Sequence, residues 1–169
     1  MKLLSSKNKI KENKFKDYII DNKSAFYRIA YSYVKNEDDA LDIVQESICK
    51  GLSSINKLES IDYVKPWFYK ILINTSIDYI RKNKKYVHVQ DEFLELNSCE
   101  YSISVDSEID IQRALDNLPN EYKSVIILRY FEDLKISDIA TVLNENENTI
   151  KTRLYRSLKM LKLEIEEIL

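Results

Sequence analysis

Glycine occurs once among the 169 residues of this chain, and proline occurs only twice. Tight turns and phosphate-binding loops rely on the backbone freedom that glycine supplies. Neither a P-loop nor a G-x-G-x-x-G fingerprint can be written with the lone Gly51, so nucleotide-handling enzymes of those classes are excluded. Apolar residues recur instead at helical spacing, and sustained alternation is scarce. The sequence therefore predicts an all-α fold.

The N-terminal half carries this helical periodicity in several segments. A short helix is expected around residues 15–20, and a second one runs through residues 26–33. Residues 36–39 supply a polar break and the start of a third helix. A fourth begins near Tyr63, where Pro66 is tolerated because a first-turn proline forfeits no intrahelical hydrogen bond.

Periodicity fades beyond this fourth helix and then returns. The stretch between is acidic: residues 91–110 hold seven carboxylates and no lysine or arginine, which predicts a flexible linker without its own core. Further amphipathic helices follow, with a polar turn at residues 144–147 before the last one. The predicted divisions are a helical bundle at residues 1–85, an acidic linker at 86–108 and a second helical domain at 109–169.

Two helices joined by a short turn, the second of them basic, describe a helix-turn-helix at the C-terminal end. We expect Asn144 to take the left-handed conformation that ends the first helix, and Asn146 to cap the second. Residues 148–163 hold five basic side chains and no acid, and such a helix fits the DNA major groove. The residues it is expected to bury are Ile150, Leu154 and Leu158. The alternative is a solvated basic helix without a partner.

One set of residues in this domain follows a recognisable pattern. The set comprises Leu118, Pro119, Lys123, Val125, Leu128, Arg129, Leu134, Asp138, Ala140, Leu143, Glu147, Thr149, Lys151, Arg153 and Arg156. It resembles region 4 of bacterial RNA polymerase sigma factors, which reads the −35 promoter element. The family usually has serine at Lys135, glutamate at Asp138, and glycine at Asn144 and Asn148. By resemblance, bases or nearby backbone would meet Lys151, Thr152, Tyr155 and Arg156, and phosphates would meet Thr149 and Arg153.

A second pattern lies in residues 39–48 (DALDIVQESI). This segment resembles region 2.2 of the same family, the helix that docks on the clamp coiled coil of the polymerase. The resemblance implies polar and ionic contacts with a basic helical partner, and such complementarity mainly sets orientation and association rate. The residues implied are Asp38, Asp39, Asp42, Gln45 and Glu46. The alternative is an acidic helix start that the helix dipole favours.

A third pattern is the run W-x3-I-x2-N-x3-D-x2-R-K, which begins at Trp67. It resembles regions 2.3 and 2.4, where the helix holds the −10 element and the preceding loop, here residues 55–63, captures an unstacked base. Cations would follow the phosphates of the opened DNA. Trp67 and Phe68 are more often core residues at this spacing than stacking surfaces. The residues implied in −10 binding are Lys70, Asn74, Arg81, Lys82, Lys84 and Lys85.

The order of these motifs over residues 20–162, without room for regions 1.1 and 3, resembles the extracytoplasmic-function (ECF) subfamily. The resemblance implies a factor that binds core RNA polymerase and promoter DNA and directs transcription initiation through −10 and −35 recognition. The free chain would hide both binding surfaces by folding its domains together, or a partner anti-sigma factor would hold it inactive. Catalysis belongs to the polymerase, so we expect neither an enzyme nor a cofactor nor a small-molecule substrate.

The remaining sequence signals indicate a cytoplasmic protein. The N-terminal apolar run is too short for a signal peptide or a membrane span. Cys49 and Cys99 have no framework spacing, and His88 stands alone, so neither a disulfide scaffold nor a metal site is expected.

Two other functions remain open. A conventional helix-turn-helix regulator would bind an operator without polymerase, usually as a dimer, but would have no need for the motifs at residues 39–48 and 66–82. A non-DNA adaptor would use its basic helix to bind an acidic protein, and would lack salt-sensitive binding to duplex DNA.

Overall fold

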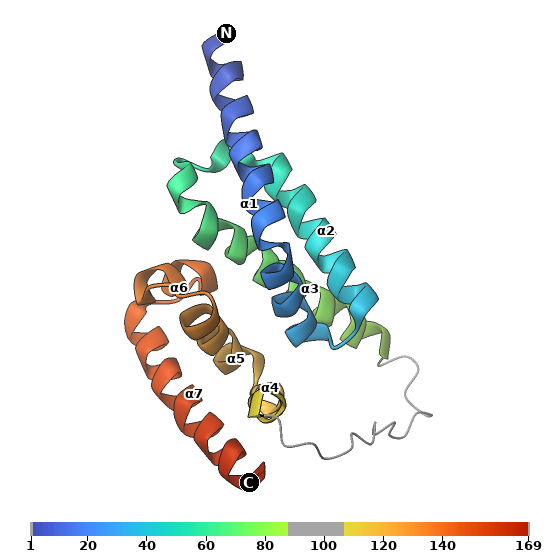
Figure 1. Ribbon diagram of the computed structural model, residues 1–169, viewed down its shortest axis with the longest axis vertical. Helices are drawn as coiled ribbons and strands as arrows, with labels where there is room; N and C mark the ends of the chain where they lie inside the picture. The colour runs from blue at the N-terminus through green and yellow to red at the C-terminus, as the bar shows by residue number, and fades with distance from the viewer. Residues whose placement is uncertain (1, 88–106, 169) are drawn as a thin grey trace. The chain divides into compact units, whose positions relative to one another are not determined.

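The computed structural model describes residues 2–87 and 107–168, and every element of regular structure in these two ranges is a helix. Helices α1 and α2, with α3 up to Lys82, belong to one compact unit, and helices α4, α5 and α7, with α6 up to Ala140, belong to a second (Figure 1). The predicted all-α fold is confirmed. The domain boundaries drawn at residues 85 and 109 stay predictions, and most of the predicted acidic linker, with His88 and Cys99, lies outside the described residues.

The first unit contains α1 (Lys2–Val34), α2 (Glu37–Ser54) and α3 (Val64–Val87). Two short 3-10 turns, η1 (Ile55–Lys57) and η2 (Ile61–Tyr63), connect α2 to α3. The predicted start of α2 is confirmed, because the Asn36 side chain accepts a hydrogen bond of 2.9 Å from the backbone N–H of Asp39. Pro66 stands in the first turn of α3, also as predicted.

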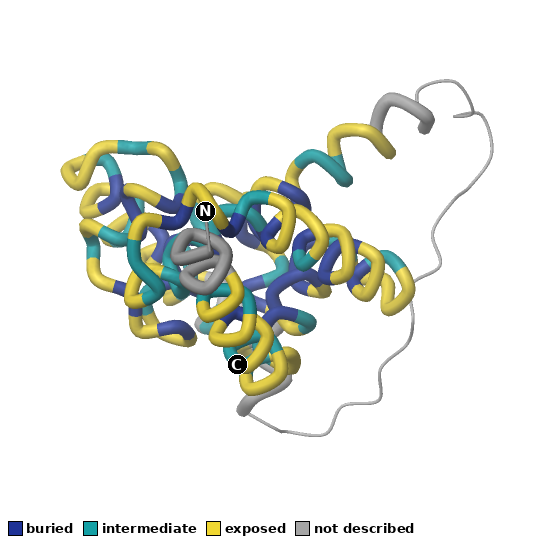
Figure 2. Tube along the Cα trace, turned by 90° about the horizontal axis from the view of Figure 1, so that it is seen from above, coloured by how far each residue is buried: buried dark blue, intermediate teal, exposed yellow. Residues whose placement is uncertain are grey.

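An aromatic cluster forms the centre of this unit. Phe15, Phe26, Phe68 and Tyr69 are fully buried, and the rings of Phe26 and Phe68 meet edge to face with centroids 4.7 Å apart. Such edge-to-face pairs contribute about 0.5–1.5 kcal/mol beyond the burial of their area. Buried positions recur along the helices, with exposed positions between them (Figure 2).

The sequence prediction was wrong in dividing the first helix, because α1 continues without a break from Lys2 to Val34. The polar residues between the two predicted segments include no glycine or proline that would end a helix. Within this stretch the Asn22 amide donates a hydrogen bond of 2.9 Å to the carbonyl of Tyr18, one turn earlier. The helix ends at Val34, and the next residue, Lys35, has a φ of 56°, the left-handed conformation common after helices.

The second unit contains α4 (Ser107–Asn117), α5 (Asn120–Ile126), α6 (Ile136–Leu143) and α7 (Glu147–Ile168). A π-helical turn, η3 (Ile127–Phe131), extends α5. Its small core contains residues of α4, α5, α7 and the turn between α4 and α5: Leu115, Leu118, Ile126, Leu154, Met160 and Leu161. Packing of α5 and α4 against α7 therefore fixes the long last helix in place.

The turn before α7 has the predicted chemistry. Asn144 takes a left-handed conformation with a φ of 55°, and the Asn146 side chain accepts a 2.8 Å hydrogen bond from the Thr149 backbone N–H. The predicted burial of Ile150 is also confirmed, and Leu154 packs against the core. The prediction for Leu158 was wrong, because this side chain is 40% exposed.

Ser157 is the residue that α7 buries in place of Leu158. Its hydroxyl donates 2.6 Å to the Arg153 carbonyl on its own helix and lies 3.2 Å from the Tyr122 carbonyl of α5. A small side chain at this position lets α5 and α7 approach closely, and its polarity hides it from a search for apolar spacing.

Candidate functional site

The exposed face of α7 carries the side chains predicted to meet DNA bases. Lys151, Thr152, Tyr155 and Arg156 are all exposed, and Tyr155 is exposed by 73%. Since Ile150 and Ser157 are buried and Leu154 packs against the core, the four predicted residues share the opposite side of the helix. A helix of this kind can enter a major groove with its early residues foremost.

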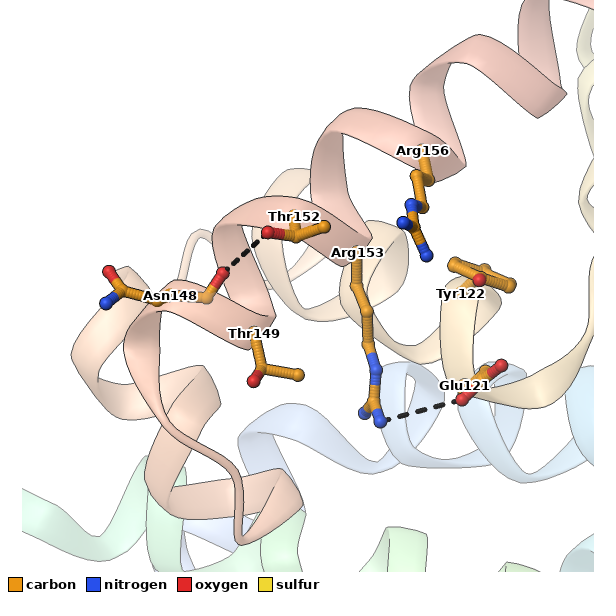
Figure 3. A pocket seen from close by; sticks show the side chains of 7 residues that line it. All are labelled: Glu121, Tyr122, Asn148, Thr149, Thr152, Arg153 and Arg156. Atoms are coloured by element: carbon orange, nitrogen blue, oxygen red, sulfur yellow. Dashed lines mark hydrogen bonds and ion pairs between the residues drawn. The ribbon is translucent and has the colours of Figure 1, made fainter.

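A hollow of about 480 Å³ lies between the start of α5 and the first turns of α7 (Figure 3). Its polar walls combine hydroxyls, two guanidinium groups and one carboxylate, and the Thr152 hydroxyl donates 2.9 Å to the Asn148 carbonyl at its edge. The residues that line it are Glu121, Tyr122, Asn148, Thr149, Thr152, Arg153 and Arg156. An anion such as a DNA phosphate suits these donors.

Arg153 differs from the other predicted DNA contacts, because two carboxylates of its own unit bind it. Its guanidinium lies 2.7 Å from Glu145 in the turn before α7 and 3.5 Å from Glu121 in the first turn of α5. The Arg153 side chain is only 22% exposed. The prediction that Arg153 holds a phosphate stays a prediction, and the structure shows that it joins three segments of the domain.

The acidic face of α2 displays most of the residues predicted to contact polymerase. Asp38, Asp42, Gln45 and Glu46 are exposed. Asp39 is half-buried, and its carboxylate accepts a hydrogen bond from the Tyr79 hydroxyl of α3. Four of the five predicted residues are thus open to a partner, while Asp39 also joins α2 to α3.

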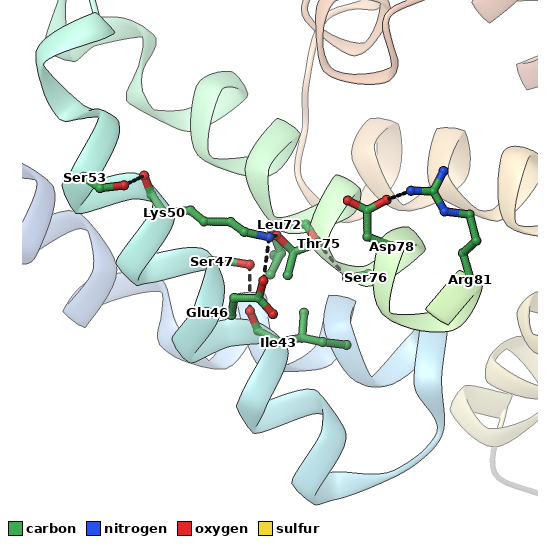
Figure 4. Close-up of polar contacts among 10 residues, drawn as sticks. All are labelled: Ile43, Glu46, Ser47, Lys50, Ser53, Leu72, Thr75, Ser76, Asp78 and Arg81. Carbon is green, nitrogen blue, oxygen red and sulfur yellow. Dashed lines mark hydrogen bonds and ion pairs between the residues drawn. The ribbon is translucent and has the colours of Figure 1, made fainter. Parts of the chain in front are cut away.

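Glu46 belongs to a small polar network between α2 and α3 (Figure 4). Its carboxylate lies 2.7 Å from the Lys50 ammonium, which donates a 3.1 Å hydrogen bond to the hydroxyl of Thr75. Both members of the ion pair are nearly half exposed, so the pair contributes little to stability by itself. Its effect is to fix the Glu46 side chain on the acidic face.

A second hollow of about 390 Å³ lies between α1 and α2, and the sequence reading missed it. It is lined by Lys23, Ser24, Tyr27, Arg28, Leu41 and Val44. Partial burial, with the nearby groups Glu37, Tyr31 and Asp38, raises the pKa of the Tyr27 hydroxyl. The exposed Leu41 stands on α2 beside Asp42, so polar and apolar groups adjoin each other here.

The predicted −10 residues are spread along α3. Asn74, Arg81 and Lys82 are exposed and Lys70 is half-buried, whereas the side chains of Lys84 and Lys85 lie outside the described residues. The Arg81 guanidinium forms an exposed ion pair of 2.8 Å with Asp78, one turn earlier.

The aromatic residues near the start of α3 divide into core and surface. Phe68 is buried, and the half-buried Trp67 ring meets Phe15 edge to face at 5.7 Å, so the expectation of a core role holds for Phe68 and in part for Trp67. In the preceding loop Ile55 and Leu58 are buried, but Tyr63 is exposed by 64%. Tyr63 therefore offers the open aromatic surface that Trp67 does not.

No group of three or more His, Cys, Asp or Glu residues within residues 2–87 and 107–168 is placed to hold a metal ion. Within the same two ranges, none of the helices is both long and apolar enough to cross a membrane.

Comparisons with known proteins match each unit to a known family. Residues 18–86 match the family model of sigma-70 region 2, and residues 108–161 match that of sigma-70 region 4. The RNA polymerase sigma factor SigV of Bacillus subtilis (strain 168) is 52% identical over 147 residues, which cover 87% of this chain and 88% of SigV. The ECF RNA polymerase sigma factor SigW of the same organism is 26% identical, over 93% of this chain and 91% of SigW.

Solved structures show the same likeness. The sigma factor RpoE from Bartonella quintana, in complex with the anti-sigma factor NepR, matches with a TM-score of 0.75 and 25% identity, over 90% of this chain and 96% of RpoE. CnrH, in complex with the cytosolic domain of CnrY, matches in fold with a TM-score of 0.68 at 16% identity, over 98% of this chain and 96% of CnrH.

Proposed function

Because this chain belongs to the extracytoplasmic-function family of RNA polymerase sigma factors, we propose that its two helical units divide the work of promoter selection. A sigma factor directs transcription initiation and is not itself an enzyme; the polymerase performs the chemistry. The observation that carries the division is the contrast between the acidic exposed face of α2 and the basic exposed face of α7. One fits a basic protein surface, and the other fits DNA.

The −35 contact is assigned to α7. Lys151, Thr152, Tyr155 and Arg156 face outward and would meet base edges or nearby backbone, while Thr149 and Arg153 line the hollow where a phosphate would sit. Side chains that reach bases give sequence preference, and contacts to phosphates give position and sequence-independent affinity.

The −10 contact is assigned to α3 and the loop before it. Lys70, Asn74, Arg81 and Lys82, with Lys84 and Lys85 further along the sequence, would follow the DNA backbone. Tyr63 adds an exposed ring at the end of the loop. Stacking of an unpaired base on such a ring contributes about 1–3 kcal/mol to binding.

The contact with core polymerase is assigned to the acidic face of α2. Asp38, Asp42, Gln45 and Glu46 supply the polar contacts, and Asp39 contributes while held by Tyr79. The hollow between α1 and α2 extends this surface, because exposed Leu41 lies both on its wall and beside Asp42. An apolar centre with a charged rim is the usual composition of a protein interface.

An anti-sigma protein is the proposed regulator, and the cytoplasm is the proposed location. Two of the matched structures are complexes, one of the sigma factor RpoE with the anti-sigma factor NepR and one of CnrH with the cytosolic domain of CnrY. A partner that covered the acidic face of α2 would keep this chain from the polymerase. The same face would then serve both partners in turn.

The proposed function is tested by run-off transcription. Core polymerase and fragmented genomic DNA are both taken from the organism that encodes this chain. Added chain should produce discrete transcripts from a small set of fragments, and Arg156→Ala should reduce them. Binding of the chain to specific fragments without any polymerase-dependent transcript would favour the conventional regulator instead.

A further inference from the structure

Glu121 is an acidic residue in a hollow that otherwise suits phosphate. It lies in the first turn of α5, and its carboxylate approaches the Arg153 guanidinium to 3.5 Å (Figure 3). Arg156, Thr149 and Glu121 line the same hollow. A carboxylate and a phosphate oxygen compete for the same guanidinium donors, so Glu121 occupies Arg153 as a DNA phosphate would.

The two acids that bind Arg153 are not equivalent. Glu145 makes the short contact of 2.7 Å and is 33% exposed, whereas Glu121 makes the long one and is 52% exposed. Glu145 does not line the hollow, but Glu121 does. Glu145 therefore fixes the Arg153 side chain, and Glu121 is the partner that a phosphate would displace.

We propose that Glu121 lowers the affinity of α7 for the DNA backbone, by competing with a phosphate for the guanidinium of Arg153. This inference rests on the proposed contact of α7 with DNA. Phosphate contacts are the same for every sequence, while contacts to base edges are not. By withholding one phosphate contact, Glu121 lowers affinity for all DNA and leaves discrimination to the bases that α7 reads.

The test is a fluorescence-anisotropy titration of the full chain with a short labelled duplex of mixed sequence, repeated over a range of salt concentrations. Glu121→Gln keeps the shape of the side chain and removes its charge. We expect this variant to bind several-fold more tightly at low salt, with a slope of log affinity against log salt steeper by about 0.9, the value for one more phosphate contact.

Two controls separate this effect from a general change of charge. Glu147→Gln makes the same charge change at the exposed start of α7, outside the hollow, and should leave the slope nearly unchanged. Glu121→Gln in an Arg153→Gln background should have little effect, because the group it competes for is gone. Arg153→Lys in place of Arg153→Gln keeps the positive charge and should restore part of the effect. Circular dichroism shows whether each variant retains its helices.

Equal effects of Glu121→Gln with and without Arg153 would overturn the inference, as would an unchanged affinity and slope in the single variant. A different result marks failure of the proposed function: no salt-sensitive duplex binding by any folded protein, wild type included, would remove the DNA contact of α7 and the inference together.

Discussion

Gly51 is buried in α2 against the ring of Phe15, and this contact explains why a glycine fits at this position inside a helix. A Cβ built at this position would lie 2.6 Å from the Cζ atom of Phe15, far inside van der Waals contact. Phe15 cannot easily move, because it is fully buried and packs edge to face on Trp67 and Phe68. The glycine therefore serves helix packing rather than a turn.

Gly51→Ala should destabilise the first unit although alanine is the better helix former. Overpacking a core costs about 1–3 kcal/mol, which exceeds the gain of about 1 kcal/mol in helix propensity. Urea unfolding followed by circular dichroism measures the difference. Cys49→Ala, at an exposed position of the same helix, is the matched control and should change stability little. An alanine variant as stable as the wild type would show that the Phe15 ring can shift to make room for the added methyl group.

Helix ends depend on single polar residues, and α7 gives a clear example. Asn146 accepts a hydrogen bond from Thr149 at the start of α7, and Asn144 ends α6 at a positive φ. Because α7 carries the proposed DNA-reading residues, its cap matters to binding as well as to stability.

Asn146→Ala should cost about 1 kcal/mol of stability, since it leaves the Thr149 N–H without its side-chain acceptor. Asn144→Gly should be neutral or stabilising, because glycine reaches positive φ without a Cβ penalty. Thermal unfolding of the two variants measures both effects. Asn148→Ala, at an exposed position in the first turn of α7, is the control. A stable Asn146→Ala variant would show that the cap contributes nothing.

Local rules predicted these helix boundaries from the sequence, and longer-range features escaped them. The caps at Asn36 and Asn146 and the left-handed Asn144 each follow from the preference of one residue type. The ion pairs of Arg153 with Glu121 and Glu145 depend on how α5 and the turn pack against α7. No spacing rule contains that packing, and the hollow between α1 and α2 was missed for the same reason.

At the scale of the whole molecule, the proposed function places the contact with core polymerase on one unit and the contact with −35 DNA on the other. Gln45 and Glu46 stand on α2 in the first, and Arg156 stands on α7 in the second. Each of these side chains is exposed, so replacing it should disturb binding far more than folding.

Arg156→Ala should weaken binding to −35 duplex DNA by about 1–3 kcal/mol and leave binding to core polymerase unchanged. The double variant Gln45→Ala with Glu46→Ala should do the reverse, since the two surfaces share no residue. Anisotropy with duplex DNA and gel filtration with core polymerase, run on both variants, measure the two functions separately. If both variants lost the same function to the same degree, the division between the units would be wrong.

The most direct measurement is a gel-filtration titration of the chain against core RNA polymerase from the same cell, with no DNA present. We expect a stoichiometric complex that survives Arg156→Ala and is lost in the Gln45→Ala, Glu46→Ala variant. A folded chain that bound duplex DNA but formed no complex with this polymerase would contradict the proposed docking and favour a conventional helix-turn-helix regulator.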